Sequence, residues 1–270
     1  MPRSNTPSQE GLAPDWLIPD WPVPAQVRAL CTTRQGGVSQ GPYAGLNLGL
    51  HVADDAAHVA INRQRLAIGL GSRPVFLNQV HGTACVAIDT STPDGTEADA
   101  CTTAEPGAVC TVMVADCLPV LFAASDGSRV AAAHAGWRGL LGHGGKGVLE
   151  VSLESFRPLA HVNAAADAPE VIAWLGPCIG PSAFEVGDEV RAAFVEAHPD
   201  AAAFFAAHTA GKWWADLPGL ARYRLQAAGV RRIFGNDGST PWCTVNNPSR
   251  FFSHRRDRVS GRFAACIWLE

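Results

Sequence analysis

Three apolar runs in the middle of the chain constrain its fold more than any other feature. They cover residues 109–114, 118–124 and 130–133, and a turn signal at Asp126-Gly127 separates the last two. A strand with one solvated face alternates apolar and polar residues, whereas these runs are almost continuously apolar. They therefore predict strands of a central sheet that is covered on both faces.

Shorter apolar segments add strands on either side of this block. Strands are expected at 27–33, 75–80, 84–88, 171–175, 232–234 and 263–269. Strands and helices interleave, but many gaps between strands have the length of a hairpin, which a simple doubly wound sheet does not have. The pattern predicts a layered α/β (α+β) fold with mixed sheets.

Three helices are expected between these strands. The first covers residues 147–156, the second begins at Gly187-Asp188, and the third begins at Asp216 and stops at Gly229. The second helix presents one apolar stripe, formed by Val190, Phe194 and Ala197. The third presents another, formed by Leu217, Leu220, Ala221 and Ala228.

Charge and hydropathy exclude two classes of partner. The 270 residues carry a net charge of −4, whereas a dedicated nucleic-acid-binding protein is usually basic. The longest apolar stretch, 108–124, is interrupted by Asp116 and Pro119 and falls short of a membrane-spanning helix. The N-terminal residues lack the apolar segment of a secretory signal. We therefore expect a cytoplasmic protein with no nucleic-acid and no membrane partner.

Three short segments concentrate residues that a core does not need, and each lies at the end of a predicted strand. They are NQVHG at 78–82, ADCLP at 115–119 and HAGWRG at 134–139. If the three strands are neighbours, His81, Cys117 and His134 converge. Two imidazoles and a thiolate are good zinc ligands, and a fourth position left open is typical of a catalytic site.

The same residues allow two other interpretations. Cys117 could be the nucleophile of a cysteine hydrolase with His134 as its base. Asp116 would orient that imidazole only if the backbone turns there, because adjacent residues on a strand face opposite sides. A structural zinc site would need a fourth protein ligand, for which Cys178 is the candidate. None of the eight cysteines forms a C-x-x-C pair, so no zinc ribbon is indicated.

Two arginine-containing segments are candidates for anion binding. Arg34 begins the glycine-rich segment 34–41, where glycines let backbone N–H groups approach an anion. Residues 249–257 combine aromatic rings with three arginines, among them Arg255. The alternative for the first segment is a mobile surface loop, and the alternative for the second is an exposed salt-bridged loop.

Five segments together resemble the YfiH family, also called the laccase-domain or polyphenol oxidase family. They are LNQVHG (77–82), ADCLPVLF (115–122), AAHAGWRG (132–139), WLGPCIGPSAFEVGDEV (174–190) and SRFFSHRRDRVSGR (249–262). The family includes purine nucleoside phosphorylases and the peptidoglycan editing factor. The resemblance implies an α/β/β/α sandwich, similar to that of a bacterial toxin with a Cys–His site. The motifs extend to the C-terminus and point at one site, so we expect one catalytic domain over residues 26–270. Residues 1–25 match none of the motifs, and because their first fifteen residues are polar and contain proline, we expect a flexible segment there.

The resemblance also implies a metal centre and an activity. Its metal ligands correspond to His81, Cys117 and His134, with zinc as the metal and copper as another possible occupant. Its activity is phosphorolysis of adenosine, inosine, guanosine and methylthioadenosine to a free base and ribose 1-phosphate, with adenosine deamination alongside. His254 is a departure, because the family more often has tyrosine in that motif.

Roles for further residues follow from residue type and from their place in these motifs. Phosphorolysis needs a positioned phosphate, for which Arg34, Arg138 and Arg255 are the candidates. Gln79 is a candidate substrate contact. A carboxyl group, Asp116 or Glu185, is the candidate for moving the proton.

Two rival functions remain open. Copper-dependent oxidation of phenols usually needs many imidazoles, whereas this chain has nine histidines and no H-x-H pair. A cysteine hydrolase that trims an amide of a cell-wall precursor would use Cys117 directly and would not need a metal.

Overall fold

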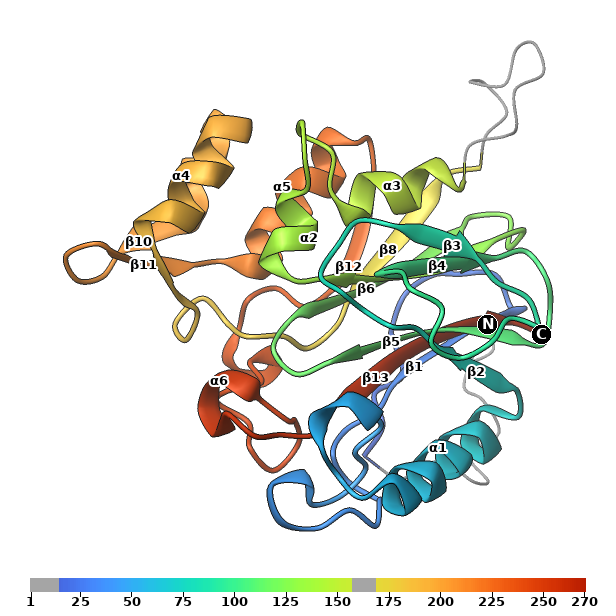
Figure 1. The fold of residues 1–270 in the computed structure, drawn as a ribbon. Helices are drawn as coiled ribbons and strands as arrows, with labels where there is room; N and C mark the ends of the chain where they lie inside the picture. The colour runs from blue at the N-terminus through green and yellow to red at the C-terminus, as the bar shows by residue number, and fades with distance from the viewer. Residues whose placement is uncertain (1–14, 157–168) are drawn as a thin grey trace.

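The computed structural model describes residues 15–156 and 169–270. Its elements form four stacked layers, which Figure 1 shows from the edge. Helix α1 (Ala56–Leu70) covers a four-stranded sheet, and a six-stranded sheet stacks on the other face of that sheet. Helices α2 (Trp137–Leu141), α3 (Val148–Glu154) and α5 (Leu217–Ala227) cover the outer face of the six-stranded sheet. The α/β/β/α arrangement expected from the sequence is confirmed.

The sheets are mixed, as the sequence predicts. The four-stranded sheet has the order β1 (Val27–Cys31), β13 (Phe263–Leu269), β5 (Ala108–Val114) and β2 (Arg73–Phe76), and only its β2–β5 pair is parallel. The six-stranded sheet has the order β12 (Arg232–Gly235), β8 (Val171–Leu175), β6 (Leu118–Ala124), β7 (Val130–Ala135), β4 (Ala100–Thr103) and β3 (Cys85–Ala87). Its β12–β8 and β3–β4 pairs are parallel.

The remaining elements lie at one end of the sandwich. A small antiparallel sheet contains β10 (Phe205–Ala207), β11 (Lys212–Ala215) and β9 (Glu185–Gly187). Helix α4 (Asp188–Ala197) and the short α6 (His254–Asp257) complete the helices. The 3-10 turns in the described part of the chain are η1 (Gly41–Tyr43), η2 (Leu50–Val52), η3 (Pro199–Phe204) and η4 (Thr240–Trp242).

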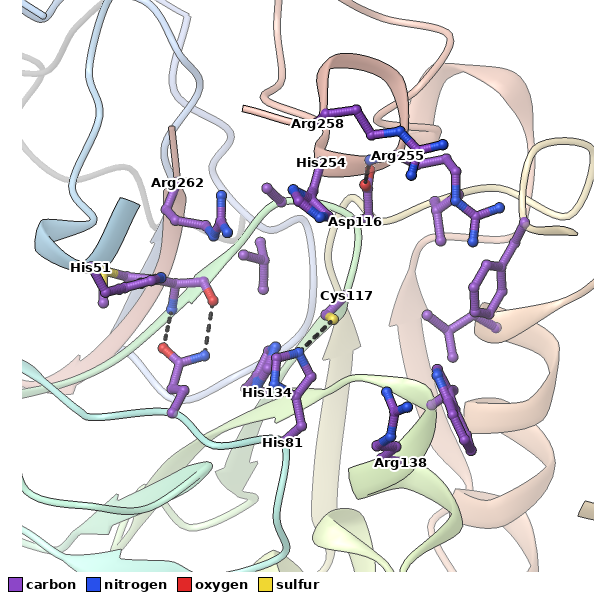
Figure 2. Close-up of a pocket in the computed structure, with 18 residues that line it drawn as sticks. His51, His81, Asp116, Cys117, His134, Arg138, His254, Arg255, Arg258 and Arg262 are labelled. Atoms are coloured by element: carbon purple, nitrogen blue, oxygen red, sulfur yellow. Dashed lines mark hydrogen bonds between the residues drawn. The ribbon is translucent and has the colours of Figure 1, made fainter. Parts of the chain in front are cut away.

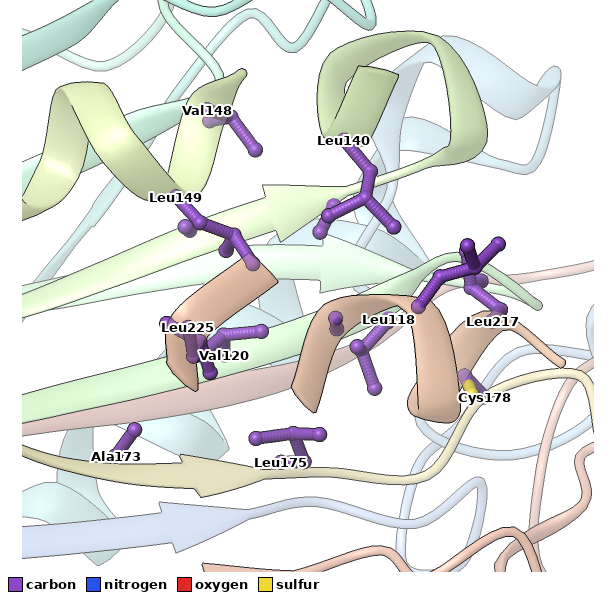
Figure 3. Close-up of a cluster of buried hydrophobic side chains, with 14 of the residues drawn as sticks. Leu118, Val120, Leu140, Val148, Leu149, Ala173, Leu175, Cys178, Leu217 and Leu225 are labelled. Atoms are coloured by element: carbon purple, nitrogen blue, oxygen red, sulfur yellow. The ribbon is translucent and has the colours of Figure 1, made fainter. Parts of the chain in front are cut away.

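Each layer boundary has its own hydrophobic core, and this explains the continuous apolar runs. Along β6, Val120 and Phe122 pack toward the helices, whereas Leu121 and Ala123 pack between the two sheets. Figure 3 shows the helix-side core, where β6 meets α2, α3 and α5. Strand β13 divides its side chains in the same way between the inter-sheet core and the core beneath α1. Every position of such a strand is buried, so it has no polar face.

The structure differs from the sequence prediction at several element ends. Ala197 and Ala228 are exposed, because each lies at or beyond the last turn of its helix. The strand expected at 75–80 ends at Phe76, after which the chain turns. Helix α1 was not predicted at all.

Order in the N-terminal segment begins before residue 26. Residues 1–14 lie outside the described part of the chain, but Leu17 forms two backbone hydrogen bonds with Cys31, each 2.8 Å long. Trp21 is buried in the inter-sheet core. Within residues 15–25, Leu17 is therefore paired with the end of β1, and Trp21 contributes to the core.

Over residues 15–156 and 169–270, we find no helix that combines the length and the apolar character needed to cross a membrane.

Candidate metal centre and active-site cavity

A cavity of about 440 Å³ opens at the ends of β5, β6 and β7. One wall is largely apolar and contains Trp137, Ile179, Phe184 and Leu217. Met113, Val114 and Ala115 also line the cavity. The polar lining residues are His51, Gln79, His81, Asp116, Cys117, His134, Arg138, His254, Arg255, Arg258 and Arg262. Figure 2 shows the Cys117 sulfur next to His81 and His134, with Arg138, Arg255, Arg258 and Arg262 around them.

The three residues expected to bind a metal meet in this cavity. His134 lies on β7, Cys117 directly precedes the neighbouring strand β6, and His81 lies in the turn after β2. Their ligand atoms all lie within 4.8 Å of one another. The Cys117 sulfur is 3.7 Å from Nε2 of His81, and the two imidazole rings meet edge to face with 4.8 Å between centroids. The sequence hypothesis that these side chains converge agrees with this geometry.

The two imidazoles change the acidity of the thiol. Burial acts to raise the pKa of Cys117, but the charge and hydrogen bond of His134, together with those of His81, outweigh it and lower that pKa to about 6. Burial acts to lower the pKa of His134, but the Cys117 thiolate and the hydrogen bond to Asp99 raise it to about 9. Without a metal, the two groups therefore form a thiolate–imidazolium pair at neutral pH.

Sequence reasoning missed Asp99, which contacts both histidine segments. Its carboxylate is fully buried, lies 2.8 Å from Nδ1 of His134, and accepts the backbone N–H groups of Val80, His81 and Gly82. The β4–β7 register pairs Ala100 with Ala133 and so places Asp99 beside His134. Strand β4 was not predicted, so the sequence offered no signal for this pairing.

Two glycines of the HAGWRG motif allow the segments to approach closely. A Cβ atom on Gly136 would lie 2.9 Å from Cδ2 of His81 and 3.0 Å from the Cys117 sulfur. A Cβ atom on Gly139 would lie 2.7 Å from the carbonyl oxygen of Gly82. The motif needs glycine at both positions because any side chain would clash with His81 and Cys117 at Gly136, or with the backbone of the His81 turn at Gly139.

Asp116 accepts hydrogen bonds from three other segments around the cavity. Its φ of 98° shows that the backbone turns before β6, which is the condition under which its side chain could face the site. One carboxylate oxygen accepts the Thr244 hydroxyl at 2.6 Å, and the other accepts the Arg255 N–H at 2.6 Å. Its carbonyl oxygen accepts the Ile179 N–H at 2.8 Å. Asp116 thus lines the cavity with both carboxylate oxygens already hydrogen-bonded.

Four guanidinium groups surround the cavity. Arg138 stacks on Trp137, with 4.3 Å between its guanidinium carbon and the ring centroid, and its guanidinium forms no hydrogen bond within residues 15–156 and 169–270. Arg255 donates one N–H to the carbonyl oxygen of Glu185. Arg258 and Arg262 complete the set, and neither was singled out from the sequence.

Three other candidate residues have their polar groups directed elsewhere. Arg34 does not line the cavity: it donates to the carbonyl oxygens of Ala44 and Pro248. Gln79 lines the cavity, but its amide forms two hydrogen bonds with the backbone of Met113, at 2.8 and 2.9 Å. The Glu185 carboxylate lies 3.4 Å from Nε2 of His208 and does not line the cavity.

The fourth-ligand alternative has no geometric support. Cys178 is fully buried and is not part of the His81–Cys117–His134 group. It pairs with Cys243 in an isolated β-bridge, and its sulfur accepts a hydrogen bond from Asn236. Among the described residues, the group that could hold a metal ion offers three protein ligands, which would leave the fourth position of a tetrahedral zinc site open.

A family model described as multi-copper polyphenol oxidoreductase laccase matches residues 28–270. The chain belongs to this family. A purine nucleoside phosphorylase of Pseudomonas aeruginosa is 50% identical over 96% of this chain and 98% of its own length. The purine nucleoside phosphorylase YfiH of Escherichia coli is 48% identical over the same shares. The resemblance to the YfiH family is thereby confirmed.

Solved structures of relatives share the fold. A Neisseria meningitidis protein matches with a TM-score of 0.85 at 43% identity, covering 95% of this chain and 99% of that one. YlmD from Geobacillus stearothermophilus matches with a TM-score of 0.77 at 33% identity, covering 91% of this chain and 93% of that one.

Proposed function

We propose that this laccase-family chain is a zinc-dependent purine nucleoside phosphorylase with adenosine deamination as a side activity. Its substrates would be adenosine, inosine, guanosine and methylthioadenosine. The observation that carries the proposal is one cavity whose lining includes both the His81–Cys117–His134 group and the guanidinium groups of arginines such as Arg138 and Arg255. Relatives about half identical over nearly their whole length bear the same enzyme name.

The donor set fits a zinc ion. Two imidazole nitrogens and one thiolate match the ligand types that zinc prefers, and the lowered pKa of Cys117 keeps its sulfur ionised. Zinc bound there would supply a Lewis acid beside the substrate and would lower the pKa of water for attack at purine C6. Copper also binds nitrogen and sulfur ligands, but a multi-copper cluster needs more of them. Among the described residues, this is the one group of three or more such ligands.

The cavity offers distinct surroundings for the parts of a nucleoside. Its volume of about 440 Å³ suits a small ligand. The wall of Trp137, Phe184 and Leu217 offers apolar surface to a purine ring, while Arg138 and Arg255 offer donors to phosphate. In phosphorolysis a phosphate oxygen bonds to C1′, the C1′–N9 bond breaks with its electron pair going to N9, and the base takes up the proton that phosphate gives up. The guanidinium groups would hold phosphate on the sugar and balance its charge.

The first test is a product assay. Purified protein is incubated with adenosine, with and without phosphate, and the products are separated while bound metal is measured. We expect free base and ribose 1-phosphate only when phosphate is present. Base release that does not depend on phosphate, or no turnover in a zinc-replete sample, would reject the proposal.

A variant pair tests the phosphate assignment. Arg138→Ala removes a guanidinium that has no hydrogen bond within the described residues, so the fold loses little. A lost charge-assisted hydrogen bond is worth about 1.5–3 kcal/mol, so we expect the KM for phosphate to rise about 10- to 100-fold. Arg34→Ala is the control: it removes contacts outside the cavity and should leave this KM unchanged. Equal effects of the two substitutions would contradict the assignment.

A cysteine hydrolase is the second candidate, because Cys117, His134 and Asp99 have the arrangement of a nucleophile, a base and an orienting carboxylate. Nδ1 of His134 lies 2.8 Å from Asp99, and the lowered pKa gives Cys117 the thiolate that such an enzyme uses. The two candidates differ in their response to chelation. A metal-dependent phosphorylase loses activity when zinc is stripped, whereas a hydrolase of this kind keeps its activity toward an amide substrate.

A further inference from the structure

The turn that carries His81 is held by a carboxylate from another strand. Val80, His81 and Gly82 direct three successive backbone N–H groups at Asp99, with N–O distances of 3.2, 2.9 and 2.6 Å. Successive N–H groups of this kind form a concave binding site for an anion. Here the anion is an internal side chain with no exposed surface.

The conformation of His81 depends on this support. Its φ of 62° lies in the left-handed region, which residues other than glycine rarely adopt. Such a conformation persists when its surroundings hold it in place, and here three hydrogen bonds to one carboxylate do so. The side chain of His81 is itself exposed, so the three backbone hydrogen bonds to Asp99 are the buried contacts of this turn.

The same carboxylate also determines which nitrogen of His134 faces the thiol. Asp99 Oδ1 lies 2.8 Å from Nδ1 of His134, which is nearly fully buried. An ionised carboxylate only accepts hydrogen bonds, so Nδ1 carries the proton and Nε2 is left for a ligand. The backbone reinforces this contact, since the His134 N–H donates to the Asp99 carbonyl oxygen at 2.7 Å.

We infer that Asp99 is the positioning residue of the metal centre, because one buried carboxylate sets both the His81 turn and the orientation of the His134 ring. This inference rests on the proposed metal centre and not on the nucleoside substrate. Asp99 does not act as a ligand itself. Outer partners of this kind orient metal-bound histidines and keep their ring nitrogens available.

The test compares two isosteric substitutions. Asp99→Asn keeps the shape of the side chain but adds donors that face the N–H groups of the turn and Nδ1 of His134. Asp94→Asn is the matched control: Asp94 also accepts a backbone N–H, from Phe76, and pairs with Arg63 and Arg73 away from the cavity. Zinc affinity is measured by competition with a chromophoric chelator, and the melting temperature is measured alongside.

We expect Asp99→Asn to weaken zinc binding about 10- to 100-fold, as removal of an outer partner usually does, and Asp94→Asn to leave it unchanged. Zinc affinity within twofold of wild type in Asp99→Asn overturns the inference. Equal weakening in both variants, or no measurable zinc binding by wild-type protein, also overturns it. If zinc affinity changes as expected in both variants but the wild-type protein shows no phosphate-dependent base release, the proposed function is rejected and this inference stands.

A measurement on the wild-type protein covers the case in which Asp99→Asn does not fold. We expect the amides of His81 and Gly82 to exchange hydrogen at least tenfold more slowly than the amide of Gly144. Gly144 lies in an exposed turn, and its N–H has no hydrogen bond to any residue that the structure describes. Exchange of all three amides at the same rate would show that Asp99 does not hold the turn.

Discussion

At the scale of single residues, the reactivity of Cys117 is set by its two histidine neighbours. An ordinary cysteine thiol titrates near 9, whereas His134 and His81 outweigh burial and lower the pKa of Cys117 to about 6. In metal-free protein, alkylation by iodoacetamide should therefore rise with pH, with a midpoint near 6, and should level off above pH 7. The thiolate is the nucleophile, so the rate follows its fraction. Peptide mass spectrometry across pH 5–9 measures this profile.

Cys85 supplies an internal control in the same experiment. It is also only partly buried, but burial and the neighbouring Cys101 raise its pKa to about 12. We expect it to stay unmodified across the whole range. A Cys117 profile with its midpoint near 9 would show that the imidazoles do not stabilise the thiolate. Zinc should suppress the alkylation of Cys117 at every pH.

The residues of the candidate site were predictable from the sequence to different degrees. His81, Cys117 and His134 stand out because polar residues interrupt apolar runs at strand ends. Asp99 gives no such signal, because its role depends on the pairing of β4 with β7, and pairing is a property of the folded sheet. Arg34 illustrates the opposite error: residue type and nearby glycines suggested an anion site, but its donors are used by backbone carbonyl groups.

At the scale of elements, the approach of α2 to the His81 turn depends on Gly136. This glycine has a φ of −67°, which any residue adopts, so its requirement is purely steric. Gly136→Ala places a methyl group 2.9 Å from the His81 ring and 3.0 Å from the Cys117 sulfur. We expect zinc affinity to fall at least tenfold while the melting temperature changes by a few degrees. Chelator competition and thermal unfolding measure the two effects.

Gly71→Ala serves as the control, because it should lower stability and leave zinc affinity unchanged. Gly71 ends α1 with a φ of 65°, and a Cβ atom there would have no neighbour within 4 Å among the described residues. Alanine is strained in that conformation and should cost about 1 kcal/mol of stability. Its distance from the cavity should leave zinc affinity intact. Unchanged zinc affinity in Gly136→Ala would mean that α2 can move away from the His81 turn.

Elements were predictable where one physical signal dominated. The strands Leu118–Ala124, Val171–Leu175 and Phe263–Leu269 begin and end as predicted, because turn signals bound their apolar runs. Helix α1 escaped prediction because its buried face includes the polar Asn62. That side chain accepts the Val38 N–H and donates to Ser39, Gly45 and Asn47, so it holds the glycine-rich loop against the helix. A buried amide of this kind interrupts the apolar period.

At the scale of the whole molecule, the two central sheets belong to more than one core. Strand β5 directs Cys110 and Val112 between the sheets and Val109 and Met113 toward α1. Strand β6 supplies both the inter-sheet core and the core beneath the outer helices. Loss of any layer therefore exposes strands on which the next layer depends. This coupling is the physical basis for expecting residues 26–270 to behave as one domain.

The single-domain prediction is testable by unfolding two variants in opposite outer layers. Leu66→Ala removes a fully buried side chain from the core beneath α1. Leu225→Ala removes a fully buried side chain from the core between the six-stranded sheet and the outer helices. Each should lower the free energy of unfolding by about 2–5 kcal/mol. Because the layers share strands, each variant should shift one common denaturant midpoint, with far-UV circular dichroism and tryptophan fluorescence coincident. If instead each variant shifts a separate transition and leaves the other in place, the two halves of the sandwich fold independently, and the cavity where their strands end is an interface between domains.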